Sequence, residues 1–274
     1  MLTISALYIY PIKSLGGISL DTATLTDRGF THDRRWMLVD ENNLFISQRE
    51  VAELALMHVE IVGEGLKITY QPKASSIIIP FKAQTDEFAE VIIWDDTCMG
   101  QFVGKETDDW FGRMLGIACR LVYMPDNSFR YTDSRYTPDG YIASYADAYP
   151  FLLISQASLD NLNSKLKDAL PMDRFRPNIV FTGGEPFGED LMHTFTIGDV
   201  TFHGVKLCAR CPIPTINQQT LHRGKEPLKT LAGYRFKNNK ILFGQNLIHE
   251  GSGYISVGDE LNVIQLNHEE RFFI

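Results

Sequence analysis

Cysteine is scarce in this sequence: 274 residues contain only four, Cys98, Cys119, Cys208 and Cys211. A secreted disulfide framework uses more cysteines at closer spacing, so we expect a reducing compartment, the cytoplasm. The sequence also lacks an apolar run long enough to span a bilayer, and its first residues lack the basic and apolar stretches of a signal peptide. We therefore predict a cytoplasmic protein with no membrane partner.

Positive charge is in deficit as well. The chain carries 26 Lys and Arg against 34 Asp and Glu, which gives a formal net charge of −8. Nucleic acid binding needs a basic face, so this balance argues against nucleic acid as a partner, although a local basic pocket for a small anion is compatible with it. Hydrophobic residues make up 44% of the chain, which is ordinary for a globular protein of one large domain or two small ones.

Short apolar or alternating runs dominate the first hundred residues and return in the last hundred. Closely spaced short strands of this kind are typical of barrels and sandwiches. We predict a mostly β protein with a few helices (α+β), in two β-rich halves joined by the weakly patterned segment 125–145. The expected strands are 4–10, 18–25, 36–39, 44–46, 59–62, 66–70, 76–79, 91–94, 121–124, 179–181, 195–197, 200–202 and 261–266, with hairpins around 40–43, 63–65 and 198–199.

Three segments carry helix signals. Apolar spacing predicts a helix over 107–115, with Thr107 as its N-cap and Gly116 as its stop. Leucines at helical spacing predict a second helix over 155–170. A short third helix is expected to begin near Pro227.

Cys208 and Cys211 are separated by two residues, a spacing with several readings. A redox-active pair is expected to open a helix, which Pro212 and Pro214 disfavour. A structural zinc site needs four ligands, and the remaining Cys and His residues are poorly spaced for it. Either both cysteines are small buried side chains at a strand end, or one thiol ligates a metal or acts as a nucleophile. For the second reading we favour Cys211, because the charge of Arg210 beside it favours the thiolate.

Three further segments place cations at the mouths of predicted strands. Arginine and lysine are the usual holders of phosphate, whereas a lone surface arginine more often forms a weak salt bridge. The residue pattern alone does not show that the three segments converge. They are 11–14 with Lys13 and Ser14, 33–36 with Arg34, and 174–178 with Arg176 and Asn178.

Together these motifs resemble the MOSC family of molybdenum-cofactor proteins, in the two-part form shared by the mitochondrial amidoxime-reducing component and bacterial reductases of N-hydroxylated compounds. The resemblance covers nearly the whole chain. It implies a MOSC N-terminal β-barrel domain over 1–122 and a MOSC β-barrel domain over 123–274. The motifs that carry it are Tyr10-Pro-Ile-Lys-Ser14, Gly29 with Asp33-Arg-Arg-Trp36, the Pro150-Phe-Leu-Leu run to Leu159, Arg174-Phe-Arg-Pro-Asn178, Cys208-Ala-Arg-Cys211, Lys225-Glu-Pro-Leu228 and Phe243-Gly-Gln245.

The resemblance also implies a site. The molybdenum cofactor (Mo-molybdopterin) would lie between the two domains, with Cys211 as thiolate ligand of the metal and as a catalytic residue. Asp147 matches an acidic position near the metal and would relay protons. Ala148, Tyr149 and Asn246 depart from the hydroxyl-bearing residues that the family has there. Cofactor contacts are implied for Lys13, Ser14, Arg34, Arg176, Asn178 and Arg210.

The implied activity is a molybdenum-dependent reduction of N-hydroxylated or N-oxygenated compounds, such as hydroxylaminopurines, amidoximes and hydroxylamines. A role in detoxification and a family-wide association with pyridoxal phosphate binding come with it. Because the sequence ends at Ile274 without further cysteines for an iron–sulfur cluster, we expect a separate electron-transfer protein of the flavin reductase, ferredoxin or cytochrome type. Two alternatives are a carrier of molybdenum cofactor or sulfur that uses Cys211 without redox turnover, and a structural β-barrel interaction protein.

Overall fold

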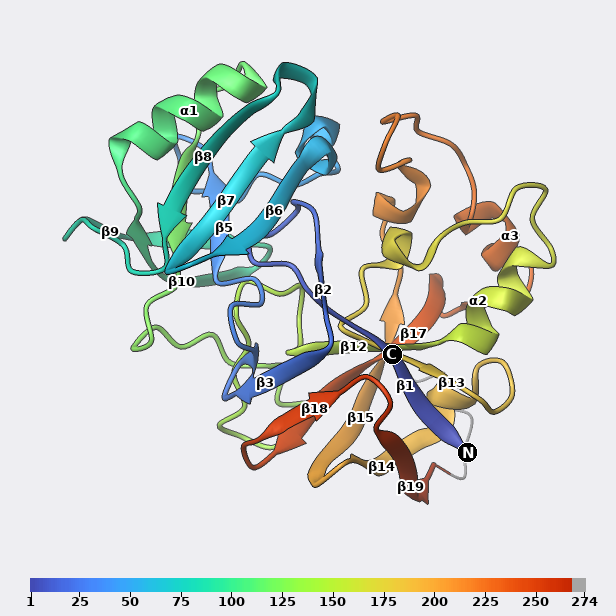
Figure 1. The fold of residues 1–274 in the computed structure, drawn as a ribbon. Helices are drawn as coiled ribbons and strands as arrows, with labels where there is room; N and C mark the ends of the chain where they lie inside the picture. The colour runs from blue at the N-terminus through green and yellow to red at the C-terminus, as the bar shows by residue number, and fades with distance from the viewer. Residues whose placement is uncertain (268–274) are drawn as a thin grey trace.

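A closed β-barrel forms the lower lobe of the computed structural model in Figure 1, which describes residues 1–267. Within these residues seven strands close the barrel, because β17, the seventh strand in the hydrogen-bonded order, also pairs with the first strand, β12. Alternate apolar side chains fill its interior, where the rings of Phe195 and Phe202 stack at 5.8 Å. In order the strands are β12 (Phe151–Ser155), β13 (Ile179–Thr182), β1 (Leu2–Ile9), β19 (Glu260–Leu266), β14 (Met192–Ile197), β15 (Val200–Ala209) and β17 (Lys240–Glu250).

The N-terminal strands belong to this barrel rather than to the upper lobe. β1 pairs with β13 on one side and with β19 on the other. The prediction of one strand over 18–25 is wrong, because the run divides at Asp21 into two strands with different partners. The two strands are β2 (Ile18–Leu20), which pairs with β1, and β3 (Thr22–Thr26), which pairs with β4 (Gly29–Phe30) and β18 (Tyr254–Ser256). The chain therefore enters the upper lobe briefly between β1 and β2 and crosses to it again after β4.

Two small antiparallel sheets and a helix make up the upper lobe, which is an open half-barrel (Figure 1). The hairpin predicted around 63–65 is confirmed. The hairpin predicted from 36–39 and 44–46 is present in short form, because Val39 and Phe45 make an antiparallel bridge that backbone hydrogen bonds flank on both sides. Residues 44–46 do not form a full strand, and the main partner of 36–39 is 120–123. One sheet contains β5 (Trp36–Val39), β11 (Arg120–Tyr123), β10 (Asp96–Phe102) and β9 (Phe88–Ile93), and the other contains β6 (Met57–Val62), β7 (Gly65–Tyr70) and β8 (Ser75–Pro80).

The first helix, α1 (Lys105–Leu115), covers the upper lobe with its buried Trp110 and Phe111. Gly116 ends it in the left-handed conformation, with φ of 72°, as predicted. The predicted N-cap is wrong: Gly104 holds that position, and Thr107 is buried inside the first turn.

The second helix, α2 (Gln156–Asn163), ends seven residues earlier than predicted. Its N-cap is Ser155, whose hydroxyl accepts the N–H of Ser158 at 3.0 Å. It stops early because the amide of Asn163 bonds both the N–H and the C=O of Leu170, at 2.9 and 3.0 Å, and closes the rest of the leucine run into a loop.

Residues 1–267 contain one more α-helix, α3 (Leu228–Ala232), close to the position predicted for it. No helix in this described part of the chain is long and apolar enough to cross a membrane. The short 3-10 turns are Ala52–Leu56, Gln71–Lys73, Met172–Phe175, Gly188–Leu191 and Ile213–Thr215. The short strand β16 (Phe236–Lys237) pairs antiparallel with the start of β17. The predicted mostly β class with a few helices is therefore confirmed.

Residues 124–150 connect the lobes without a strand or helix. The buried guanidinium of Arg130 organises this segment: it donates to the carbonyls of Ser144, Ala146 and Asp147 at 3.1, 2.6 and 3.0 Å and pairs with Asp96 at 2.7 Å. We keep the division into 1–122 and 123–274 as a proposal, in which β1 to β4 complete the barrel of the second range.

Candidate functional site

A cavity of about 210 Å³ lies where the two lobes meet. It brings together all eight residues that the resemblance singles out, although they come from five separate stretches of the chain. These residues are Lys13, Ser14, Arg34, Asp147, Arg176, Asn178, Arg210 and Cys211.

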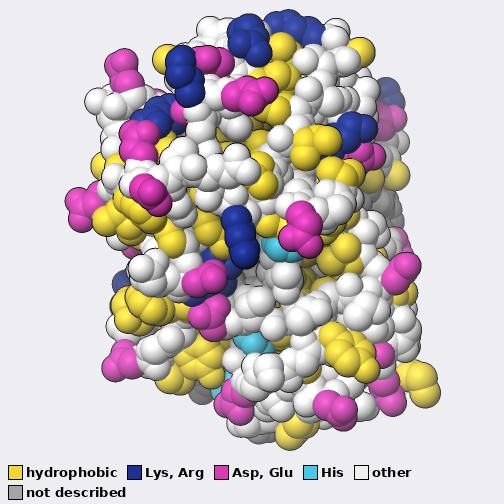
Figure 2. Space-filling view, turned by 60° about the vertical axis from the view of Figure 1, so that its left-hand side comes forward, with side chains coloured by type: hydrophobic (Ala, Val, Ile, Leu, Met, Phe, Trp, Pro, Cys, Tyr) yellow, Lys and Arg dark blue, Asp and Glu magenta, His cyan; other side chains and the backbone are white. Residues whose placement is uncertain are grey.

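Cationic side chains dominate the cavity wall. In the described part of the chain, five ammonium or guanidinium groups and one carboxylate, that of Asp147, line it. On the outer surface, acidic side chains spread across the face in Figure 2, while basic ones gather at its top and in a recess at mid-height. A basic pocket inside an acidic protein suits a small anion rather than a nucleic acid. The cations are Lys13, Arg34, Arg49, Arg176 and Arg210.

Lys13 and Asp147 form an ion pair at the centre of the site. The Lys13 ammonium donates to Asp147 Oδ1 at 2.6 Å and to the carbonyl of Tyr145 at 2.9 Å. Its side chain is 8% exposed, whereas that of Asp147 is 63% exposed. Burial lowers the pKa of Lys13 to about 8 against the opposing effect of Asp147. Although enclosure by the cavity favours the neutral acid, the Lys13 charge and hydrogen bond hold the pKa of Asp147 well below its usual range, so this carboxylate is ionised at neutral pH.

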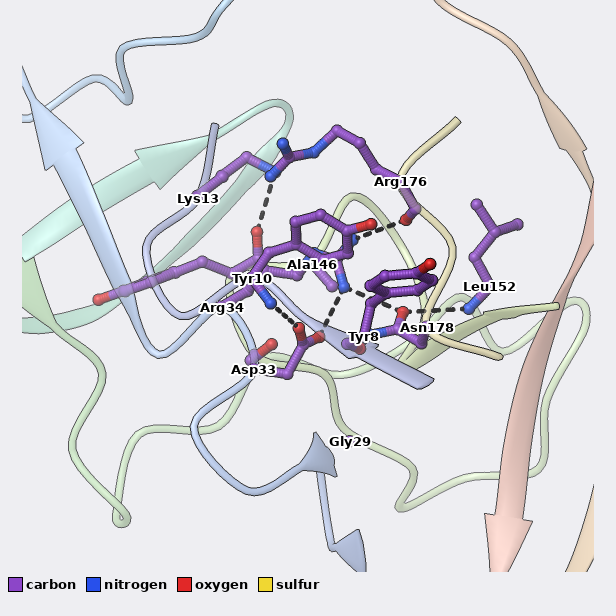
Figure 3. Close-up of polar contacts among 12 residues, drawn as sticks. Tyr8, Tyr10, Lys13, Gly29, Asp33, Arg34, Ala146, Leu152, Arg176 and Asn178 are labelled. Atoms are coloured by element: carbon purple, nitrogen blue, oxygen red, sulfur yellow. Dashed lines mark hydrogen bonds and ion pairs between the residues drawn. The ribbon is translucent and has the colours of Figure 1, made fainter. Parts of the chain in front are cut away.

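Arg34 is held by its neighbour Asp33 and by two residues that lie far away in the sequence, Arg176 and Asn178 (Figure 3). Its guanidinium donates to Asp33 Oδ2 at 2.6 Å, to Asn178 Oδ1 at 2.9 Å and to the carbonyl of Arg176 at 3.2 Å. The guanidinium groups of Arg34 and Arg176 both lie against the Tyr10 ring, at 4.5 and 4.2 Å. The segments that follow β1 and β4 thus meet the segment before β13 here.

The amide of Asn178 is occupied by protein contacts. Its Oδ1 also accepts the N–H of Leu152 at 3.3 Å, and its Nδ2 donates to the carbonyl of Tyr8 at 3.2 Å. Asn178 lines the cavity, yet its geometry is that of a residue that positions Arg34.

Left-handed backbone conformations recur around the cavity. Ser14, Arg34, Trp94 and Arg176 have φ values of 72°, 50°, 55° and 55°. Non-glycine residues rarely adopt this conformation, and it gathers at functional sites where surrounding contacts hold it.

The two cavity cysteines are free thiols at the end of β15. Arg210 donates to Cys208 Sγ at 3.3 Å and to the carbonyl of Phe175 at 2.7 Å. Burial raises the pKa of the Cys208 thiol, and the charge of Arg210 opposes that rise. Cys98 and Cys119 are buried outside the cavity, each with its pKa raised to about 11 by burial.

The protein alone offers no complete metal shell. Across residues 1–267, no group of three or more His, Cys, Asp and Glu side chains is placed to hold a metal ion. A metal beside Cys211 would therefore need most of its ligands from a non-protein group. Within residues 1–267, three buried polar atoms on the cavity wall have no hydrogen-bond partner and are open to a bound cofactor or substrate: Arg49 Nε, Tyr149 Oη and Arg210 Nε.

Sequence reasoning missed Arg49, Trp94 and Arg130. The Arg49 guanidinium lies 4.1 Å from the centre of the Trp94 ring, and the Trp94 indole donates to Asp147 Oδ1 at 3.4 Å. The one signal for Trp94 was an aromatic residue at a turn before Asp95 and Asp96; Arg49 and Arg130 had none. Of the departures from the family pattern, Ala148 and Tyr149 line the cavity, and Asn246 does so while donating to the carbonyl of Lys206 at 3.0 Å.

Comparison with known proteins identifies both halves of the chain. Residues 1–118 match the MOSC N-terminal beta barrel domain and residues 141–262 match the MOSC domain. The chain is 34% identical to mitochondrial amidoxime reducing component 2 of Rattus norvegicus, over 94% of this chain and 82% of that protein. It is 30% identical to mitochondrial amidoxime-reducing component 1 of Homo sapiens, over 96% of this chain and 83% of that protein. It is also 32% identical to the molybdenum cofactor sulfurase of Oryza sativa subsp. japonica, over 90% of this chain and 32% of that protein.

Proposed function

Because the chain belongs to the MOSC family, with a MOSC N-terminal β-barrel domain ahead of its MOSC domain, we propose that it is a molybdenum-cofactor-dependent reductase of N-hydroxylated compounds. The observation that carries the proposal is the convergence of Cys211 with five cations in one cavity between the lobes. Relatives named for amidoxime reduction, which align along nearly the whole chain, support the reaction class.

The residues present fit molybdopterin. The cofactor carries a phosphate, for which Lys13, Arg34 and Arg176 are suitable cations, and Arg210 is placed for a further contact. We assign Cys211 as the one protein thiolate on the metal, and Ser14 as a hydroxyl contact. Asn178 acts in this proposal by holding Arg34. When bound, the cofactor supplies two-electron oxygen-transfer chemistry that no side chain offers.

The overall reaction would convert R–NHOH, two electrons and two protons into R–NH₂ and water. We propose that Asp147 hands protons between solvent and the substrate, since its side chain is 63% exposed and lines the same cavity as Cys211. The Lys13 ammonium, bound to Oδ1, and Arg130, bound to the Asp147 carbonyl, hold it in place. The electrons would come from a separate flavin, ferredoxin or cytochrome-type protein. The cytoplasmic location, the detoxification role and the association with pyridoxal phosphate stay predictions.

Cofactor content tests the proposal directly. The protein would be purified from cells that make molybdenum cofactor, and its molybdenum and pterin would be measured together with benzamidoxime reduction by an artificial donor. We expect Cys211→Ser to lose metal and turnover, and Cys208→Ser, the same change three positions away, to keep them. A parent protein without metal and pterin would overturn the proposal.

A second candidate is a carrier of molybdenum cofactor or of sulfur. It is supported by the free thiols of Cys208 and Cys211 in one cavity and by the likeness to molybdenum cofactor sulfurases. It predicts a persulfide on Cys211, or bound cofactor without turnover. Mass spectrometry of the purified protein, beside the benzamidoxime assay, separates the two candidates.

A further inference from the structure

Two of the five cavity cations have no polar partner for their side chains in residues 1–267. Lys13 pairs with Asp147, Arg34 with Asp33, and Arg210 bonds a carbonyl and a thiol. The guanidinium groups of Arg49 and Arg176 contact only aromatic rings, those of Trp94 and Tyr10. Both arginines therefore keep hydrogen-bond donors for an anion, although the charge of each also acts on the Asp147 carboxylate.

The two unpaired guanidinium groups come from opposite lobes. Arg176 lies in the barrel lobe, against the same Tyr10 ring as Arg34, so it belongs with the cations assigned above to the cofactor phosphate. Arg49 belongs to the upper lobe, where it lies over Trp94, which follows β9. Since Arg34 and Arg176 are assigned to the cofactor phosphate beside Tyr10, the charge of Arg49 remains available for a second anion.

The wall around Arg49 is aromatic. The Trp94 ring contacts the Phe45 ring edge-on at 4.6 Å, and Phe45 is buried. The indole N–H of Trp94 points to Asp147, the carboxylate proposed to serve the reacting group. An aromatic surface thus runs between a free cation and the reaction centre.

The backbone of Arg49 is held from both lobes. Its N–H donates to Ser47 Oγ at 3.1 Å, and its carbonyl accepts from Arg223 of the barrel lobe at 2.8 Å. The neighbouring Gln48 bonds Gln218 of that lobe at 2.9 Å. A cation held in this way loses little freedom on binding a ligand, which favours selective recognition.

We propose that Arg49 and Trp94 form a substrate subsite for planar aromatic N-hydroxylated compounds that carry a carboxylate. The ring lies on the indole wall, the carboxylate pairs with Arg49, and the N-hydroxy group points toward Asp147 and Cys211. This subsite rests on the proposed reductase function and narrows its substrate class.

The kinetic test compares benzamidoxime with 4-carboxybenzamidoxime in the cofactor-loaded protein. We expect the parent to favour the carboxylated compound in kcat/KM, and Arg49→Gln to raise KM for that compound about tenfold more than for the neutral one. Arg49→Lys keeps a charge and should restore part of the difference. Arg113→Gln removes one positive charge from α1, outside the cavity, and controls for long-range attraction. Equal kcat/KM values in the parent, or equal KM changes in Arg49→Gln, would overturn the subsite.

A binding test without cofactor keeps the two proposals separable. Trp94 is partly exposed, whereas Trp36 and Trp110 are 1% and 5% exposed, so 4-carboxybenzamidoxime should quench mainly Trp94 fluorescence. We expect the quenching to disappear in Trp94→Phe and to need a much higher concentration in Arg49→Gln. Unchanged quenching in Arg49→Gln argues against the subsite. Suppose that binding depends on Arg49 in this way, but the cofactor-loaded protein reduces neither compound. The subsite is then retained and the reductase proposal is rejected.

Discussion

Lys13 and Asp147 are 134 positions apart in the sequence, yet the ammonium of one lies 2.6 Å from the carboxylate of the other. Lys13 belongs to the excursion between β1 and β2, and Asp147 ends the segment that returns from the upper lobe to the barrel. The ion pair therefore ties together two of the chain crossings at the cavity. Because Asp147 remains largely exposed while Lys13 does not, the pair leaves an ionised carboxylate open to a ligand.

The lowered pKa of Lys13 predicts how anion binding depends on pH. Lys13 is charged below about pH 8 and loses its charge above that value in the ligand-free protein. An anion that binds the charged form raises this pKa, so affinity is constant below it and falls by up to about tenfold per pH unit above it. Calorimetric titration of the cofactor-free protein with inorganic phosphate, from about pH 8, where phosphate is already mostly the dianion, to about pH 9.5, measures the slope.

Lys13→Arg is the matched variant for that titration, because arginine stays charged throughout the range. Its phosphate affinity should change less above pH 8 than that of the parent.

The burial of Lys13 also affects the free energy of unfolding, which changes with pH in the opposite direction to the phosphate affinity. The unfolded chain holds the Lys13 proton up to its ordinary pKa, so this residue's contribution to stability rises as pH passes from about 8 toward 10.5.

Much of the local architecture could be predicted from the sequence, because strand alternation and turn residues are local signals. The hairpins around 63–65 and 198–199 are examples. The strands β12 and β17, which close the barrel, gave no alternating pattern, since both are largely buried on both sides. β12 reads as a plain apolar run, and Gly244, Gln245 and Asn246 interrupt the apolar residues of β17. The overlong prediction for α2 has a similar origin, because leucine spacing carries no information about the loop that Asn163 closes.

The residues of the site could be predicted from the sequence, but their convergence in one cavity could not. Each cationic segment stands at a strand mouth, yet only tertiary pairing brings them together, as when β1 joins β13 and sets Tyr10 beside Arg176. The MOSC resemblance supplied that convergence. Arg49 and Arg130 escaped notice because their roles depend on partners far away in the sequence.

Replacing Arg130 is expected to loosen the loop that presents Asp147. In Arg130→Gln, three carbonyls, two of them in buried hydrogen bonds, lose their guanidinium donor, and Asp96 loses its partner. We expect a loss of about 2–4 kcal/mol in the free energy of unfolding, measured by urea titration, together with a lower kcat.

Arg135→Gln is the comparison for that change, because Arg135 pairs with Asp133 at the surface and its side chain is 77% exposed. Its urea midpoint should match the parent's. Similar losses in both variants would mean that Arg130 contributes only as a surface charge would.

Asn178→Ala tests the assignment of this residue as the holder of Arg34. The change leaves the Leu152 N–H and the Tyr8 carbonyl without the side-chain partner they have in the parent, and Arg34 loses one of its acceptors. We expect a loss of about 1–2 kcal/mol in unfolding free energy and weaker phosphate binding by the cofactor-free protein. Asn178→Asp keeps the acceptor for Arg34 and should retain more of the stability. If Asn178→Ala lowers phosphate affinity without any loss of stability, Asn178 contacts the anion directly.

The contact between Arg210 and Cys208 predicts a measurable shift in thiol titration. Burial raises the pKa of Cys208 and the Arg210 charge opposes this, so Arg210→Gln should raise that pKa further. The measurement is the rate of iodoacetamide labelling against pH in a Cys211→Ser background, where Cys208 is the remaining cysteine of the cavity. The midpoint of the curve reports the pKa, whereas easier access after loss of the bulky arginine changes only its plateau.

Cys98 and Cys119, with pKa values of about 11, should stay unlabelled at neutral pH and serve as internal controls. A midpoint that moves down or stays in place in Arg210→Gln would show that the guanidinium does not stabilise the thiolate.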